Sequence, residues 1–210
     1  MSHSRTGLDG AGAGGDVVGP ASSTQYAVAL FGDTSGKLLD EVASLGSSGD
    51  VLTSGGAGVP PTWVTPATLY SFSAYLSADT GGVTGAGTTY TVLFDTELYD
   101  NGGVYTPGTG TFTAPVTGLY QLSFSVRMEG VTAAMTNGYL ELTAAGNTWR
   151  YGETNPGVGG TRAWCASQLV SMAATNTATV KIFLANGAGN TANVAGAATL
   201  ITTFSGYLVK

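Results

Sequence analysis

Hydrophobic and polar residues alternate most regularly over residues 120–128. Tyrosine, leucine, phenylalanine, valine and methionine occupy every second position, and glutamine, serine and arginine stand between them. This period of two predicts a β-strand with one face on a core and the other toward water or a neighbouring molecule. Proline and glycine at residues 107–110 and again at 115–118 predict chain reversals before that strand. The pattern is typical of an antiparallel sheet, and we therefore expect an all-β domain.

The N-terminal part of the chain has a different character. Residues 1–66 contain thirteen glycines and too few apolar residues to form a core of their own. We therefore expect an extended, Gly-rich arm over residues 1–66 and one folded head domain over residues 67–210. A head of this length can bury roughly two-thirds of its unfolded surface, so size does not prevent it from forming a core.

One short helix is predicted within the arm, near residues 36–45. Leu38, Val42 and Leu45 are spaced i, i+4 and i+7, and Gly46 stands where a helix would end. Two turns of helix are marginal in water by themselves, so this segment would need a partner.

Charged residues make up only 10% of the chain, against about 25% in typical soluble domains. This favours burial of much of the surface in an oligomer or larger assembly, although a robust β-domain solvated by serine and threonine has the same composition. The net charge is −6: residues 1–100 contribute −8 and residues 101–210 contribute +2. No cluster of basic residues is present, so we expect no nucleic-acid partner, because phosphate binding needs several converging lysines or arginines.

Candidate catalytic groups are few. His3 is the only histidine, which leaves no Ser-His-Asp or Cys-His arrangement and no histidine-rich metal site. Cys165 is the only cysteine, and we expect its side chain to be buried as a small apolar residue. Asp95, Glu97 and Asp100 could serve a glycosidase or calcium site, but solvated strand carboxylates are the ordinary explanation. We predict that the protein is not an enzyme and uses no cofactor or metal ion.

Trp149, Tyr151 and Trp164 allow two interpretations. Flat rings on an exposed distal face would stack on sugars, whereas buried rings would belong to the core or to a subunit interface. The second interpretation is favoured, because large aromatic side chains most often supply core and interface contacts.

No run of about 18 apolar residues occurs, so we expect no membrane insertion. The first fifteen residues, MSHSRTGLDGAGAGG, lack the apolar stretch of a signal peptide. We therefore expect synthesis and folding in a cytoplasm.

A family resemblance rests on three segments of the predicted head. Residues 105–120 read YTPGTGTFTAPVTGLY, residues 203–209 read TFSGYLV, and residues 69–76 read LYSFSAYL. The first resembles the signature of the complement C1q globular head and its tumour-necrosis-factor-like relatives, and the others resemble the last and first strands of that family. The resemblance spans about residues 67–210. It implies a ten-stranded jelly-roll β-sandwich that assembles as a homotrimer. The residues that it assigns to the core and trimer motif are Tyr105, Gly110, Phe112, Pro115, Gly118, Tyr120, Phe124, Phe204, Gly206 and Tyr207.

The arm has a resemblance of its own. Residues 15–24 (GDVVGPASST), 27–31 (AVALF) with 34–38 (TSGKL), and 49–63 (GDVLTSGGAGVPPTW) resemble linker modules of bacteriophage fibre and virion-surface proteins. An arm of this composition would become ordered by threading along partner subunits. The apolar residues expected to make those contacts are Val17, Val18, Leu38, Val42, Leu45 and Trp63.

Together the two resemblances imply a structural protein of a bacteriophage virion. We expect a trimeric capsid decoration or cement protein, with residues 1–66 bound to the major capsid protein or another virion protein and the head projecting from the surface. The alternative is a short tail or head fibre that acts as a receptor-binding protein and contacts a host-surface glycan or protein. In both cases the protein would be made and assembled in the bacterial host cytoplasm and would end on the virion surface.

Overall fold

The computed structural model describes residues 28–31, 39–41, 45–152 and 159–209. The chain divides into two compact units, Met1–Ala67 and Thr68–Lys210. The sequence expectation of an arm over residues 1–66 that anchors the protein stays a prediction.

The described residues of the first unit form two small antiparallel sheets. β1 (Ala29–Phe31) pairs with β2 (Leu39–Glu41), and β3 (Val51–Thr53) pairs with β4 (Thr62–Val64). The helix predicted near residues 36–45 is therefore wrong over Leu39–Glu41. Its three apolar residues would support only two marginal turns, whereas pairing with β1 gives the backbone groups of this segment partners.

The rest of that helix prediction lies outside the described residues. The same holds for four of the predicted arm contacts, namely Val17, Val18, Leu38 and Val42. Of the other two, Leu45 is 47% exposed and Trp63 is half-buried in β4.

The second unit is a sandwich of two antiparallel sheets with thirteen strands in the described residues. The seven strands of the first sheet, here called the β11 sheet, are β5 (Ser71–Tyr75), β6 (Thr80–Thr84), β8 (Thr96–Asn101), β11 (Gly118–Val131), β14 (Gly160–Met172), β16 (Ala192–Val194) and β17 (Thr203–Leu208). The six strands of the second, the β15 sheet, are β7 (Thr88–Thr91), β9 (Tyr105–Thr106), β10 (Thr111–Thr113), β12 (Asn137–Ala144), β13 (Asn147–Tyr151) and β15 (Thr177–Ala185). A 3-10 turn, η1 (Pro107–Thr109), joins β9 to β10.

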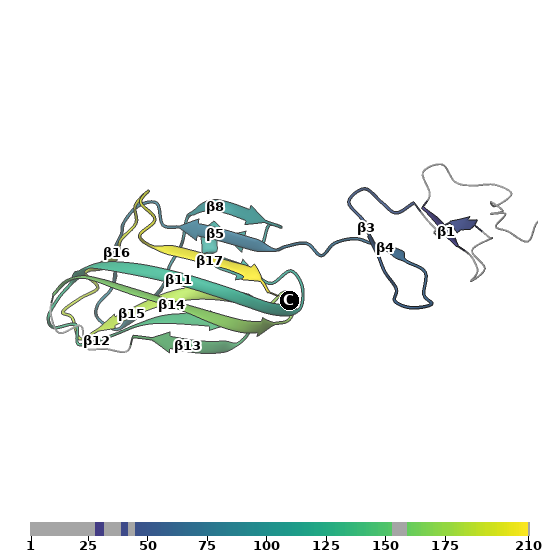
Figure 1. Cartoon of the computed structure of the whole chain (residues 1–210). Helices are drawn as coiled ribbons and strands as arrows, with labels where there is room; N and C mark the ends of the chain where they lie inside the picture. The colour runs from purple at the N-terminus through teal and green to yellow at the C-terminus, as the bar shows by residue number, and fades with distance from the viewer. Residues whose placement is uncertain (1–27, 32–38, 42–44, 153–158, 210) are drawn as a thin grey trace, which may run out of the picture. The chain divides into compact units, whose positions relative to one another are not determined.

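β11 organises the first sheet. One edge of β11 pairs with β14 along most of its length, and the other pairs first with β17 and then with β16. β17 in turn pairs with β5, so that β5, β17, β11 and β14 lie side by side (Figure 1). In the described residues the two sheets hold three strands more than the ten expected. The far end of β11 pairs with the short β16, which pairs with β6.

The core lies between the two sheets. Phe72 of β5 stacks on Tyr105 of β9, with ring centroids 4.9 Å apart, and packs edge-on against Phe204 of β17 at 4.9 Å. Phe112 of β10 stacks on Phe72 at 5.2 Å, so aromatic rings from both sheets interlock. The alternation predicted over residues 120–128 is confirmed, since its apolar members are at most 3% exposed. The predicted all-β sandwich is likewise confirmed.

Within the described residues, no helix has the length and hydropathy needed to cross a lipid bilayer.

Candidate functional site

The outer face of the β11 sheet carries uncharged side chains across four neighbouring strands. Residues that lie opposite each other on antiparallel neighbours share a face, and the buried members of each strand define the inner one. We call the opposite set the uncharged face. Its residues are Ser71, Ser73, Tyr75, Leu119, Gln121, Ser123, Ser125, Cys165, Ser167, Leu169, Ser171, Thr203, Ser205 and Tyr207.

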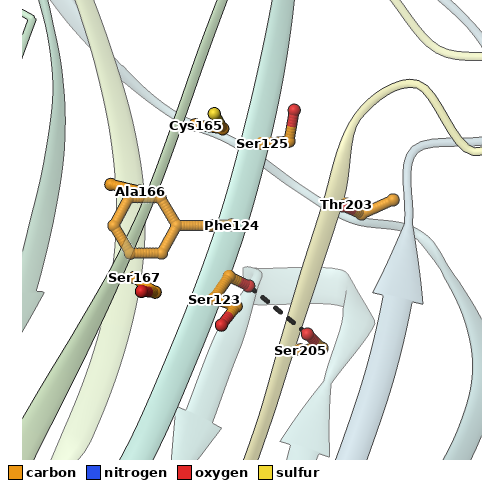
Figure 2. Close-up of a pocket in the computed structure, with 8 residues that line it drawn as sticks. All are labelled: Ser123, Phe124, Ser125, Cys165, Ala166, Ser167, Thr203 and Ser205. Carbon is orange, nitrogen blue, oxygen red and sulfur yellow. Dashed lines mark hydrogen bonds between the residues drawn. The ribbon is translucent and has the colours of Figure 1, made fainter.

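The middle of this face is a shallow hollow built from small side chains. Ser123 of β11 lies between Ser167 of β14 and Ser205 of β17, and the Ser205 hydroxyl donates to the Ser123 carbonyl at 3.5 Å (Figure 2). The next rung places Ser125 between Cys165 and Thr203. Together with Phe124 and Ala166, these residues line an open depression of about 390 Å³. Small hydroxyl side chains let another surface approach the sheet closely without desolvating a charge.

Large apolar side chains gather at one end of the uncharged face. Gln121 lies between Leu169, which is 47% exposed, and Tyr207, which is 52% exposed. Leu119, one position further along the same face of β11, is 38% exposed. Exposed apolar and aromatic residues without nearby charge are typical of protein interfaces.

Charge returns at the opposite end of β11. Arg127 and Glu129 form an ion pair there, with Nη2 3.0 Å from Oε1, and both side chains are more than a third exposed. A surface pair of this kind contributes little to stability, but it marks where the uncharged face ends.

A second feature lies where β13 and β14 meet at the side of the sandwich. Trp149 and Tyr151 of β13 and Trp164 of β14 are half-buried and pack against the core. The Tyr151 hydroxyl donates to Oε1 of Gln168 at 3.0 Å, and burial raises the pKa of Tyr151. We call these three residues the aromatic edge. They pack against the core, which agrees with the favoured interpretation and not with a flat sugar-binding platform.

Five aromatic residues of the predicted core and trimer motif lie in the core. They are Tyr105, Phe112, Tyr120, Phe124 and Phe204, each at most 5% exposed.

Two of those aromatics also fix the chain with buried hydroxyl groups. The Tyr105 hydroxyl donates to the carbonyl of Phe94 at 3.1 Å, and burial raises the pKa of Tyr105 despite that hydrogen bond. The Tyr120 hydroxyl donates to the carbonyl of Val116 at 2.6 Å, which closes the turn that begins at Pro115. Burial also raises the pKa of Tyr120.

The glycines of the motif serve close approach and turns. Gly206 is buried in β17, where an added Cβ would lie 2.7 Å from Cδ2 of Leu122. Gly110 ends the 3-10 turn with φ +64°, a conformation that L side chains rarely adopt. Gly118 begins β11. Tyr207 alone among the motif's aromatics lies on the uncharged face. A role of the motif in trimer contacts stays a prediction.

The expectation for Cys165 is wrong, because its side chain is exposed on the uncharged face. The apolar neighbours Trp164 and Ala166 take the inner positions of β14 instead, opposite Val126 and Phe124.

The carboxylates near residue 95 have structural partners. Asp95 accepts hydrogen bonds from the backbone N–H of Ser77 at 2.8 Å and from its hydroxyl at 2.9 Å. Asp100 accepts from the backbone N–H groups of Val104 at 2.8 Å and Tyr105 at 3.0 Å. In the part of the chain that the structure describes, no three His, Cys, Asp or Glu side chains gather as a metal site.

Sequence reasoning overlooked the serines of the uncharged face. The signal was present in the polar half of the alternation over residues 120–128, which predicts a face toward water or a neighbour. What the sequence did not reveal is that β14 and β17 add serine, threonine and cysteine beside it, because strand pairing brings together segments about 40 and 80 residues apart.

Comparisons with known proteins agree with this architecture. The C1q domain family model matches residues 71–209. Among solved structures, the globular domain of zebrafish complement 1qA protein is 16% identical, with a TM-score of 0.46, covering 69% of this chain and 98% of that one. Murine APRIL at pH 8.5 is 12% identical, with a TM-score of 0.48, covering 67% of this chain and 99% of that one. Comparison with curated proteins finds no match.

Proposed function

Because the chain belongs to the C1q domain family, we propose that it works as a homotrimeric structural protein whose heads join through the uncharged face. Domains of this family usually assemble as homotrimers and typically serve as ligand-binding or structural modules. The observation that carries the proposal is the uncharged face, on which the described residues of β5, β17, β11 and β14 carry no charge up to the Arg127–Glu129 ion pair at one end of β11. In an isolated head this face would leave Leu169 and Tyr207 about half exposed to water.

The aromatic edge supplies the complementary surface. The aromatic edge lies at the side of the sandwich, and the uncharged face lies on the outer face of the β11 sheet. A contact between the two therefore joins two different patches of neighbouring subunits. Such a heterologous contact closes into a ring when the rotation between subunits is right, and a threefold ring uses every face and every edge once. Aromatic residues such as Trp149 and Trp164 are favoured in the desolvated centre of interfaces.

The trimer is proposed to decorate the capsid of a bacteriophage. Support comes from the arm, whose runs at residues 15–24, 27–31 with 34–38, and 49–63 resemble linker modules of phage virion-surface proteins. In this proposal residues 1–66 bind the major capsid protein or another virion protein, and the head projects from the particle. The low charge of the chain fits a protein that is largely covered by its neighbours.

Immunogold electron microscopy on purified particles tests this placement, with antibody raised against the full-length protein. Label over the whole capsid is the expected result. Label confined to the tail tip or to one vertex would instead make the protein a host-recognition fibre. Absence of label from particles would overturn the virion proposal.

The role of the arm has its own test. A chain lacking residues 1–66 is expected to lose attachment to particles while the circular dichroism of the head stays that of a β-sandwich. Both chains are added to particles from which this protein has been removed, and the full-length chain is the matched control. Attachment of the shortened chain would move the anchor from the arm to the head.

A further inference from the structure

The hairpin formed by β3 and β4 has one covered face and one open face. Leu52 and Trp63 lie opposite each other and are half-buried. The ring of Trp63 packs on Gly46, where an added Cβ would lie 2.8 Å from the ring atoms. On the other face Val51 lies directly opposite Val64, and these side chains are 55% and 46% exposed. We call this second surface, Val51 and Val64, the valine face.

The ends of the hairpin are fixed before any partner binds. One oxygen of the Asp50 carboxylate accepts from the backbone N–H of Ser47 at 2.7 Å, and the other accepts from the Thr65 hydroxyl at 2.7 Å. The Thr65 and Ser47 hydrogen bonds lower the pKa of Asp50. Asp50 is the only charged residue between positions 45 and 66. The hairpin that carries the valine face is therefore preorganised, and Asp50, which directly precedes Val51, is the one charged residue beside that face along its own segment.

A two-stranded sheet is marginal in water, and three or more strands or a packed apolar face are needed for stability. Among the described residues, β3 and β4 pair only with each other, so both outer edges of this hairpin are unpaired. The hairpin thus has an apolar face in need of a partner and backbone edges able to support one.

We infer that the hairpins of three copies of this chain pack their valine faces together into one three-hairpin bundle, here called the stalk. The inference rests on the proposed trimer. Six residues, 65–70, separate Val64 at the end of β4 from Ser71 at the start of β5, and they span at most about 25 Å.

The short connection between β4 and β5 favours other copies of this chain as the partner of the valine face. A trimer of heads holds its three hairpins at an effective concentration of about millimolar. A neutral, apolar surface also meets an identical surface without repulsion between like charges. In this inference residues 45–66 of the arm form the trimeric stalk, and the segment before them binds the particle.

Hydrogen exchange read by mass spectrometry tests the stalk in the full-length chain. The amides of residues 51–64 are compared in the wild type, in the double variant Val51→Ser/Val64→Ser, and in Val59→Ser. Val59 is the matched control, because it is also 55% exposed but lies in the loop between the two strands. Wild type and Val59→Ser are expected to exchange about thirtyfold more slowly than the double variant, from burying the exposed halves of two valines per chain.

A fourth sample separates packing between copies from stability within one hairpin. Leu169→Arg places a charge on the uncharged face and is expected to keep the chain monomeric, so its hairpin amides should exchange as fast as those of the double variant. Protection that persists in monomeric Leu169→Arg would overturn the stalk, because one chain alone would then provide it.

The oligomeric mass of each sample, measured in parallel, tells two failures apart. A wild-type trimer with unprotected hairpin amides would overturn the stalk and leave the trimer standing. A monomeric wild type would overturn the proposed trimer and the stalk with it. Protection that arises only when the trimer is bound to particles would assign the valine face to a virion protein.

Discussion

Replacing Leu169 with arginine should convert the trimer to monomers without unfolding the head. Leu169 points outward from β14 and is 47% exposed in the single chain, so the longer, charged side chain has room in the monomer. In the trimer the same position would be covered by a neighbouring subunit. The substitution therefore acts on association and leaves the core of the sandwich untouched.

The size of the effect can be worked out from exposure. Burying a whole leucine side chain contributes about 2 kcal/mol, so covering the exposed 47% of Leu169 contributes about 1 kcal/mol per subunit. An arginine buried without a partner adds a penalty of about 3–5 kcal/mol. The sum of about 4–6 kcal/mol per subunit weakens association by a factor of at least about 1,000.

Sedimentation velocity at micromolar concentration measures the outcome, with circular dichroism to show that the β-sandwich is intact. Thr89→Arg is the matched control, because Thr89 of β7 is exposed on the outer face of the β15 sheet, away from both the uncharged face and the aromatic edge. Thr89→Arg should remain trimeric and Leu169→Arg should not. A trimeric Leu169→Arg protein would refute the assignment of the uncharged face as the interface.

Three further substitutions probe the head itself, each read as the free energy of unfolding in denaturant. Phe124→Asp should unfold the head, because Phe124 is 3% exposed and an unpaired buried charge costs several kcal/mol; a folded variant would show that its inner and outer faces have been exchanged. Gly110→Ala should lower the unfolding free energy by about 1–2 kcal/mol because of its positive φ and a nearby backbone carbonyl, whereas Gly108→Ala, with open space around it, should be neutral; equal effects would contradict the strain. Tyr105→Phe should lower it by about 1–2 kcal/mol by leaving the Phe94 carbonyl without its 3.1 Å donor, and no loss would mean that this carbonyl finds another.

The sandwich could be predicted because its strands carry local signals. The period of two over residues 120–128 identifies both faces of β11, and prolines and glycines mark the turns before it. The resembled first and last strands, at residues 69–76 and 203–209, appear as β5 (Ser71–Tyr75) and β17 (Thr203–Leu208). The alternation of apolar and polar residues within each strand predicts which side chains are buried, so the strands could be predicted without knowing how they pair.

The candidate site could not be predicted in the same way, because it depends on which strands become neighbours. Ser123 becomes part of a site only because Ser167 and Ser205 lie on either side of it. Cys165 was expected to be buried, but Trp164 takes the inner position of β14 beside it. Leu39–Glu41 shows the same limit in the arm, since a weak helical spacing there yields to pairing with β1. Non-local pairing decided each of these outcomes.

The most direct test of the trimeric head is the mass of the full-length protein by native mass spectrometry at micromolar concentration. Three times the mass of a single chain, stable on dilution, is the expected result. A single-chain mass under the same conditions would contradict assembly through the uncharged face.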